Sequence, residues 1–144
     1  NSWKFQEEKK SANIPTPFFK ISFDEDIKGV NKKGEPVELE LKETEQIPGQ
    51  TGKAVRVGTN KNSCVSFAGQ YLPLEEGTVD FFIKLAEPSK ADRFRKIIHF
   101  GQYGGLGILR NKLRWSQLFL SKKLDWKADE WHRVTLCWRP SKSK

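Results

Sequence analysis

The chain alternates short apolar runs with clusters of glycine, proline, asparagine and charged residues. The runs are rich in Val, Ile, Leu and Phe, and they have the length and composition that are typical of β-strands. No window of eleven residues carries the i, i+3, i+4, i+7 apolar stripe of an amphipathic helix. The expected strands are residues 18–24, 37–41, 54–58, 64–68, 78–85, 95–102 and 131–138. This regular spacing predicts an all-β fold, a two-sheet antiparallel β-sandwich.

A hairpin is predicted in the stretch LGILRNKLRWSQLFL, which follows the glycine-rich YGGLG. The expected two-residue turn is Asn111-Lys112, because asparagine tolerates positive φ at the first position of a tight hairpin turn. That turn would place Ile108 opposite Trp115, and Leu109 opposite Arg114.

Alternation assigns faces to the two longest strands, since successive side chains of a strand point to opposite sides. In TVDFFIKL the apolar set is Val79, Phe81, Ile83 and Leu85, which leaves Thr78, Asp80, Phe82 and Lys84 outside. In WHRVTLCW the inner set is His132, Val134, Leu136 and Trp138, and the outer set is Trp131, Arg133, Thr135 and Cys137. His132 is therefore expected to be structural.

Composition supports a single folded domain. The 144 residues are 36% hydrophobic and include five Trp and ten Phe, which a disordered chain would lack. Residues 1–17 end in SANIPTP and are predicted to form a linker or tail, and residues 18–144 form the domain. No apolar run is long enough to span a membrane. Cys64 and Cys137 leave open whether they form a disulfide or stay free.

The net charge of +8 is concentrated in one half of the chain. Residues 86–144 hold fourteen Lys and Arg against five acids, whereas residues 1–85 hold twelve against thirteen. This asymmetry suggests an anionic partner. Nucleic acid is not expected, because the basic residues are scattered and no RNA- or DNA-binding motif is present.

Three stretches in this order carry a resemblance to a known family: GKAVRVG with CVSFAG, then GTVDFFIKL, then WHRVTLCW. Together they resemble the concanavalin A-like lectin/glucanase superfamily, in particular its bacterial laminin-G-like jelly-roll domains. The resemblance implies a jelly-roll sandwich that binds carbohydrate or acts on it, in an exported protein at the cell surface or outside the cell. Such domains continue beyond their Trp-His strand, whereas RPSKSK alone follows it here. We therefore expect a domain that lacks its last strands and is part of a larger protein.

Enzymatic alternatives within that superfamily make specific demands on the sequence. Retaining glycoside hydrolases need two nearby carboxyl groups, and no Asp or Glu occurs from Arg93 to Leu124. Polysaccharide lyases need a cation and a proton-transferring Tyr or His. Residues of the right types for a lyase are Arg95, His99, Gln102, Tyr103 and Arg114.

The leading hypothesis is a non-catalytic carbohydrate-binding or accessory module, with an acidic polysaccharide as a candidate ligand. A structural or adhesive module without glycan affinity is a further alternative. Sugar binding calls for aromatic faces together with polar groups that fix orientation. The candidate residues for it are Phe82, Lys84, Arg114, Trp126, Trp131 and Arg133. No cofactor is expected apart from Ca2+, for which Asp24 and Asp26 in the stretch FDED are candidate ligands.

Overall fold

The structure is a computed structural model that describes residues 17–58, 62–71, 75–87, 94–116, 118–120 and 123–139, without the side chains of residues 103, 118 and 119. Within these ranges the fold is all-β, as predicted, and its only helical elements are the short 3-10 turns η1 (Gly69–Tyr71) and η2 (Gly101–Tyr103). The strands are β1 (Phe19–Ser22), β2 (Lys28–Asn31), β3 (Pro36–Val37), β4 (Glu40–Lys42), β5 (Glu45–Pro48), β6 (Lys53–Arg56), β7 (Cys64–Ser66), β8 (Gly77–Lys84), β9 (Arg95–His99), β10 (Gly105–Leu109), β11 (Lys112–Trp115), β12 (Leu118–Phe119) and β13 (Trp131–Trp138).

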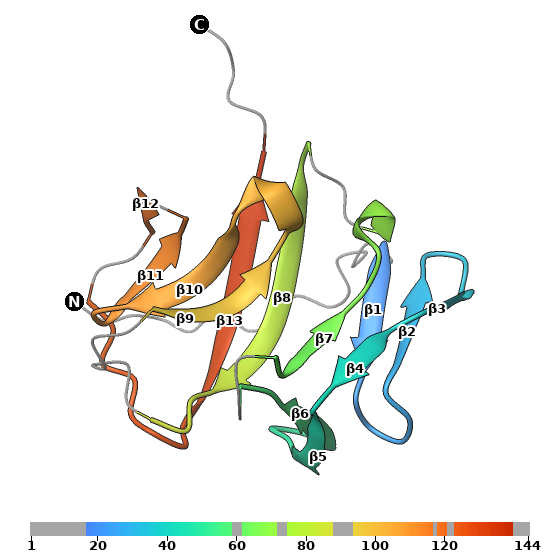
Figure 1. The fold of residues 1–144 in the computed structure, drawn as a ribbon, viewed down its shortest axis with the longest axis horizontal. Coiled ribbons are helices and arrows are strands. Elements are labelled where there is room, and N and C mark those ends of the chain that lie inside the picture. The colour runs from blue at the N-terminus through green and yellow to red at the C-terminus, as the bar shows by residue number, and fades with distance from the viewer. Residues whose placement is uncertain are drawn as a thin grey trace, which may run out of the picture.

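The strands form several small antiparallel sheets rather than two large ones. Their orders are β1-β2-β3, β12-β11-β10-β9, β13-β8, β4-β7 and β5-β6. The all-β class is thus confirmed, but a jelly-roll sandwich is not confirmed by this arrangement (Figure 1). Most of residues 1–17, the predicted tail, lie outside the described residues. No helix in the described part of the chain is long and apolar enough to cross a membrane.

Strand β2 lies where a turn was expected, and this prediction was wrong. The stretch GVNKKGEP begins inside β2 and turns into β3 within a few residues. Asn31 closes this turn, since its Oδ1 accepts hydrogen bonds from the backbone N–H groups of Lys33 (2.9 Å) and Glu35 (3.0 Å). Gly34 occupies the left-handed conformation at φ 80°, which suits a residue without a side chain. The turn therefore occupies only residues 32–35, the middle of GVNKKGEP.

The β10–β11 hairpin exists as predicted, but its turn lies one residue earlier. Arg110 and Asn111 have positive φ values of 50° and 64°, as a type I′ turn requires. Leu109 consequently pairs with Lys112, and Ile108 pairs with Leu113. The predicted register was wrong by two positions, so each β11 side chain keeps its face while its partner changes.

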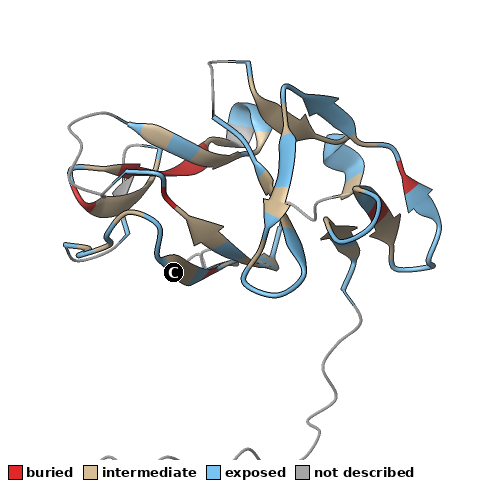
Figure 2. Ribbon diagram, turned by 90° about the horizontal axis from the view of Figure 1, so that it is seen from below, coloured by how far each residue is buried: buried red, intermediate tan, exposed pale blue. Residues whose placement is uncertain are grey.

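The main core lies between the four-stranded sheet and the β8–β13 pair, which runs behind β9 and β10 in Figure 1. Leu106 and Ile108 on β10 are 1% exposed, and Val134 on β13 is 6% exposed. Phe100 joins the two layers, because its ring lies 5.4 Å from that of Trp115 and 5.9 Å from that of Trp138. Figure 2 shows that buried segments are few and that much of the ribbon is intermediate or exposed.

Candidate functional site

The outer face of the β8–β13 pair brings together four of the six predicted carbohydrate-binding residues. The register pairs Trp131 with Lys84 and Arg133 with Phe82. Side chains at opposite positions of an antiparallel pair share a face, and diagonal neighbours lie about 7–8 Å apart. Phe82 is 52% exposed, and Trp131 is half-buried beside it. Alternation along both strands thus gives the inward and outward sets that the sequence predicts.

A hydrogen-bonded network fixes Arg133 on this face. Its Nη2 donates to Asp80 Oδ2 at 2.7 Å, and its Nε donates to Asp80 Oδ1 at 3.0 Å. Thr135 Oγ1 donates to the same Oδ1 at 2.8 Å. The bonds from Arg133 and Thr135 hold the pKa of the Asp80 carboxyl below its ordinary value, and Asp80 in turn raises the pKa of Arg133. The guanidinium is therefore held in one orientation with its charge balanced.

Lys84 is arranged in a similar way at the other end of the face. Its Nζ lies 5.4 Å from the centre of the Trp131 ring, within the range of a cation–π interaction. The same Nζ lies 4.0 Å from Asp129 Oδ1. Because Lys84 and Arg133 each have a carboxylate neighbour, this face offers aromatic surface and ordered polar groups rather than excess positive charge.

The Asp80 network predicts a specific dependence of stability on pH. A lowered folded-state pKa adds stability that is complete above the ordinary value of 3.8 and is lost as the pH falls through the lowered pKa. Asp80→Asn should therefore be less stable than the wild type at neutral pH, with the difference shrinking in acid. Urea unfolding of both proteins, from neutral pH down to below 3.8, measures this difference in the free energy of unfolding. Asp26→Asn, which changes an exposed carboxylate paired only with Lys28, is the control.

Trp126 lies away from this face. Its ring stacks on that of His132 with centres 4.3 Å apart and planes 5° from parallel. His132 belongs to the inner set of β13, so Trp126 packs toward the inner side of the pair. The structure therefore does not bring Trp126 together with Phe82 and Trp131.

Arg114 belongs to another surface, the outer face of the four-stranded sheet. There it lines a hollow with a volume of about 310 Å3 together with Phe94, Lys96, His99, Gly104, Gly105 and Ser116. Phe94 and Lys96 were missed by sequence reasoning. Of the residues named for a lyase, His99 and Arg114 both line this hollow. Arg95 lies on the inner side of the sheet, where its Nη2 donates to Glu87 Oε2 at 2.9 Å. The Gln102 side chain is exposed, and the Tyr103 side chain is outside the described residues.

The residues considered for calcium have other partners. Asp24 Oδ1 accepts a hydrogen bond from the backbone N–H of Lys53 at 3.0 Å, which ties the segment after β1 to the start of β6. Asp26 pairs with Lys28 at 3.4 Å. The described residues contain no group of three or more His, Cys, Asp or Glu side chains that could hold a metal ion.

Cys64 and Cys137 are both free thiols in the structure. Cys137 is exposed on the outer face of β13, where its Sγ accepts a hydrogen bond from Thr78 Oγ1 at 3.4 Å.

Comparison with known proteins adds no relative. No protein-family model matches the sequence, and neither the curated proteins nor the solved structures give a significant match. The described residues form an all-β fold with an exposed aromatic face on β8 and β13 and a hollow lined by Lys96, His99 and Arg114 on the four-stranded sheet.

Proposed function

We propose that the protein is a non-catalytic carbohydrate-binding module and that the outer face of β8 and β13 is its sugar-binding surface. The observation that carries the proposal is the pairing of Phe82 and Trp131 as diagonal neighbours beside a fixed polar network. A pyranose ring has apolar C–H faces that stack on aromatic rings, and its hydroxyl groups need ordered donors and acceptors. The Asp80–Arg133 pair supplies such groups without further loss of side-chain entropy.

The charge balance of this face favours a neutral sugar. Arg133 is held by Asp80, and Lys84 lies between Trp131 and Asp129, so neither offers an uncompensated charge. We also propose that the strands form a concanavalin A-like sandwich and that the protein acts outside the cell or at its surface. The all-β fold with facing antiparallel strands supports it.

Removing either ring should weaken binding. Stacking contributes about 0.5–1.5 kcal/mol beyond the area it buries, so Phe82→Ala and Trp131→Ala should each lower the affinity for a neutral polysaccharide about three- to tenfold. Binding is measured by isothermal titration against a panel of neutral glucans, mannans and xylans. Phe18→Ala is the matched control, because Phe18 is 51% exposed but precedes β1, away from this face.

Two results would contradict the proposal. One is a wild-type protein that binds no member of a panel covering neutral and acidic glycans. The other is a steady rise in ultraviolet absorbance when the protein is incubated with a uronate polymer, since a conjugated product indicates β-elimination and hence a lyase.

A further inference from the structure

The hollow on the outer face of the four-stranded sheet is built from two rows of paired residues. In the first row Lys96, Gly107 and Arg114 lie side by side on β9, β10 and β11. In the second row Gly105 pairs with His99, and its carbonyl accepts a hydrogen bond from the backbone N–H of Ser116 at 3.0 Å. Each row has a glycine in its middle. The side chains on β9 and β11 therefore stand about 10 Å apart, two strand spacings, with no side chain of β10 between them.

A β-bulge makes this arrangement possible. Leu106 pairs with Ile98 and Gly107 pairs with Lys96, so β9 has one extra residue, Ile97, at this point. Lys96 and His99 are three positions apart and would lie on opposite faces of a regular strand. The extra residue returns them to one face, and both are exposed. Bulges commonly re-aim side chains next to functional sites.

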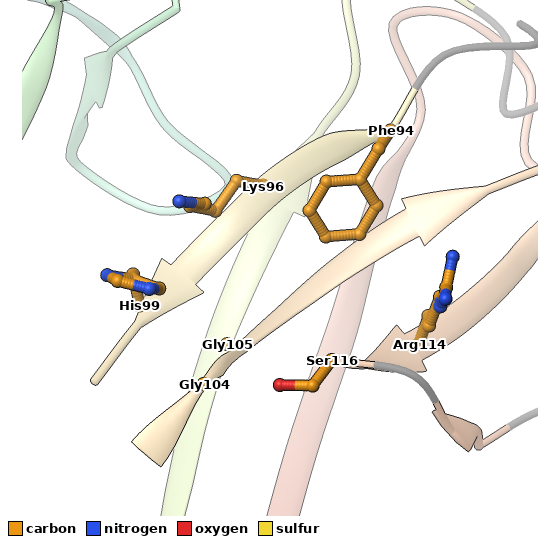
Figure 3. A pocket seen from close by; sticks show the side chains of 7 residues that line it. All are labelled: Phe94, Lys96, His99, Gly104, Gly105, Arg114 and Ser116. Atoms are coloured by element: carbon orange, nitrogen blue, oxygen red, sulfur yellow. The ribbon is translucent and has the colours of Figure 1, made fainter. Parts of the chain in front are cut away.

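Neighbouring atoms lie close against the two glycines of β10. A Cβ at Gly107 would lie 2.5 Å from the Phe94 ring and 2.6 Å from the carbonyl oxygen of Arg95, and one at Gly105 would lie 2.5 Å from the carbonyl oxygen of Ile98. No side chain fits at either position. Phe94 itself is 43% exposed, so its ring forms an aromatic wall at one end of the hollow. Figure 3 shows Phe94, Lys96 and His99 along β9, and Arg114 and Ser116 on the other side of Gly104 and Gly105.

The electrostatics of the hollow have a single sign. Lys96 and Arg114 are cations, and His99 lies beside them among the lining residues. No acid occurs anywhere from Arg93 to Leu124, the segment that contains the whole four-stranded sheet. Like charges on one small surface repel one another, and a bound anion relieves that repulsion. None of the described residues that line the hollow is acidic.

We propose that this hollow is a second binding site, which takes one acidic sugar residue by its carboxylate or sulfate group. The planar guanidinium of Arg114 suits a bidentate contact with either group, Lys96 closes the opposite side, and Phe94 offers a ring face for the sugar. A volume of about 310 Å3 lies at the lower end of the range for small-ligand pockets, which suits a single residue of a chain. The assignment of the anion to a sugar rests on the proposed function. The existence of an anion site rests only on the residues that line the hollow.

The test compares four ligands on the full chain by isothermal titration: a polygalacturonate oligomer, dextran sulfate, uncharged dextran and a single-stranded oligodeoxynucleotide of similar charge. We expect binding of at least one acidic polysaccharide, weakened by added salt because exposed charges are screened. Whichever of polygalacturonate and dextran sulfate binds more tightly shows whether the site prefers a carboxylate or a sulfate. Bonds to charged groups contribute about 1.5–3 kcal/mol, so Lys96→Gln and Arg114→Gln should each weaken that binding about tenfold or more.

Lys20→Gln removes an exposed cation of β1 and should leave the affinity unchanged. Since Lys96 is exposed, its variant should keep the wild-type melting temperature, so a loss of binding there reports on the site. Acidic ligands that bind no better than dextran, or that bind equally to Lys96→Gln and the wild type, overturn the inference. Equal or tighter binding of the oligodeoxynucleotide overturns the assignment to sugar.

Failure of the two proposals can be told apart. Phe82→Ala and Trp131→Ala should leave the acidic ligand's affinity unchanged, and Lys96→Gln should leave the neutral ligand's affinity unchanged. A wild-type protein that binds the acidic ligand but no neutral one would reject the β8–β13 surface as a sugar site and leave the hollow standing. A wild-type protein that binds a neutral ligand but no acidic one would reject the hollow alone.

Discussion

Leu106→Ala should lower the free energy of unfolding by about 2–5 kcal/mol, the range for buried leucines truncated to alanine. Leu106 is 1% exposed and lies in β10, with hydrogen-bonded strands on both sides. Neighbours fixed in a sheet cannot collapse into the space that the lost side chain leaves, so most of the cavity should persist. Equilibrium unfolding in urea, followed by tryptophan fluorescence, measures the change.

Leu41 provides the comparison for this experiment. It is 42% exposed on β4, and exposed substitutions usually change stability by less than about 0.5 kcal/mol. If Leu106→Ala and Leu41→Ala lowered the urea midpoint of unfolding equally, the layer between the four-stranded sheet and the β8–β13 pair would not be the main core.

Gly107→Ala is expected to destabilise the protein by about 1–3 kcal/mol, the usual cost of adding a methyl group to a packed site. The new Cβ would lie 2.5 Å from the Phe94 ring and 2.6 Å from the Arg95 carbonyl oxygen. Phe94 can rotate away, but the carbonyl belongs to the β9 backbone, so the bulge must shift. The substitution should therefore also weaken binding of an acidic ligand in the hollow.

Gly69→Ala is the matched control, since a Cβ at Gly69 meets nothing within 4 Å and the residue has no positive φ. Thermal unfolding of both variants measures the effect. A Gly107→Ala protein as stable as Gly69→Ala would show that β9 and β10 are less closely packed here than the structure indicates.

Sequence periodicity predicted the two long strands and several short ones, but it missed β2 and β5. β8 and β13 alternate over most of their eight residues, so both their existence and their faces could be predicted. β2 and β5, with sequences KGVN and EQIP, have too little apolar patterning to be told from turns. The hairpin register failed because Arg110 has positive φ, a conformation that its residue type does not favour.

Similar reasoning explains which parts of the site could be predicted. Phe82, Lys84, Trp131 and Arg133 come together because a period of two places them outside two adjacent strands. Their balanced charge could not be predicted, since the pairing of Arg133 with Asp80 depends on a register that links distant positions. The joint exposure of Lys96 and His99 was hidden as well, because it depends on a bulge that periodicity does not reveal.

The β8–β13 ladder also has a consequence for the order of folding. Its strands flank residues 85–130, so the four-stranded sheet is contained in the loop that the ladder closes. Hairpins between neighbouring strands form with little loss of chain entropy, whereas a ladder between distant segments must first close a long loop. The hairpin of β10 and β11 is thus the natural early structure. The sheet it belongs to shortens the effective loop, so we expect the β8–β13 ladder to form after the hairpin.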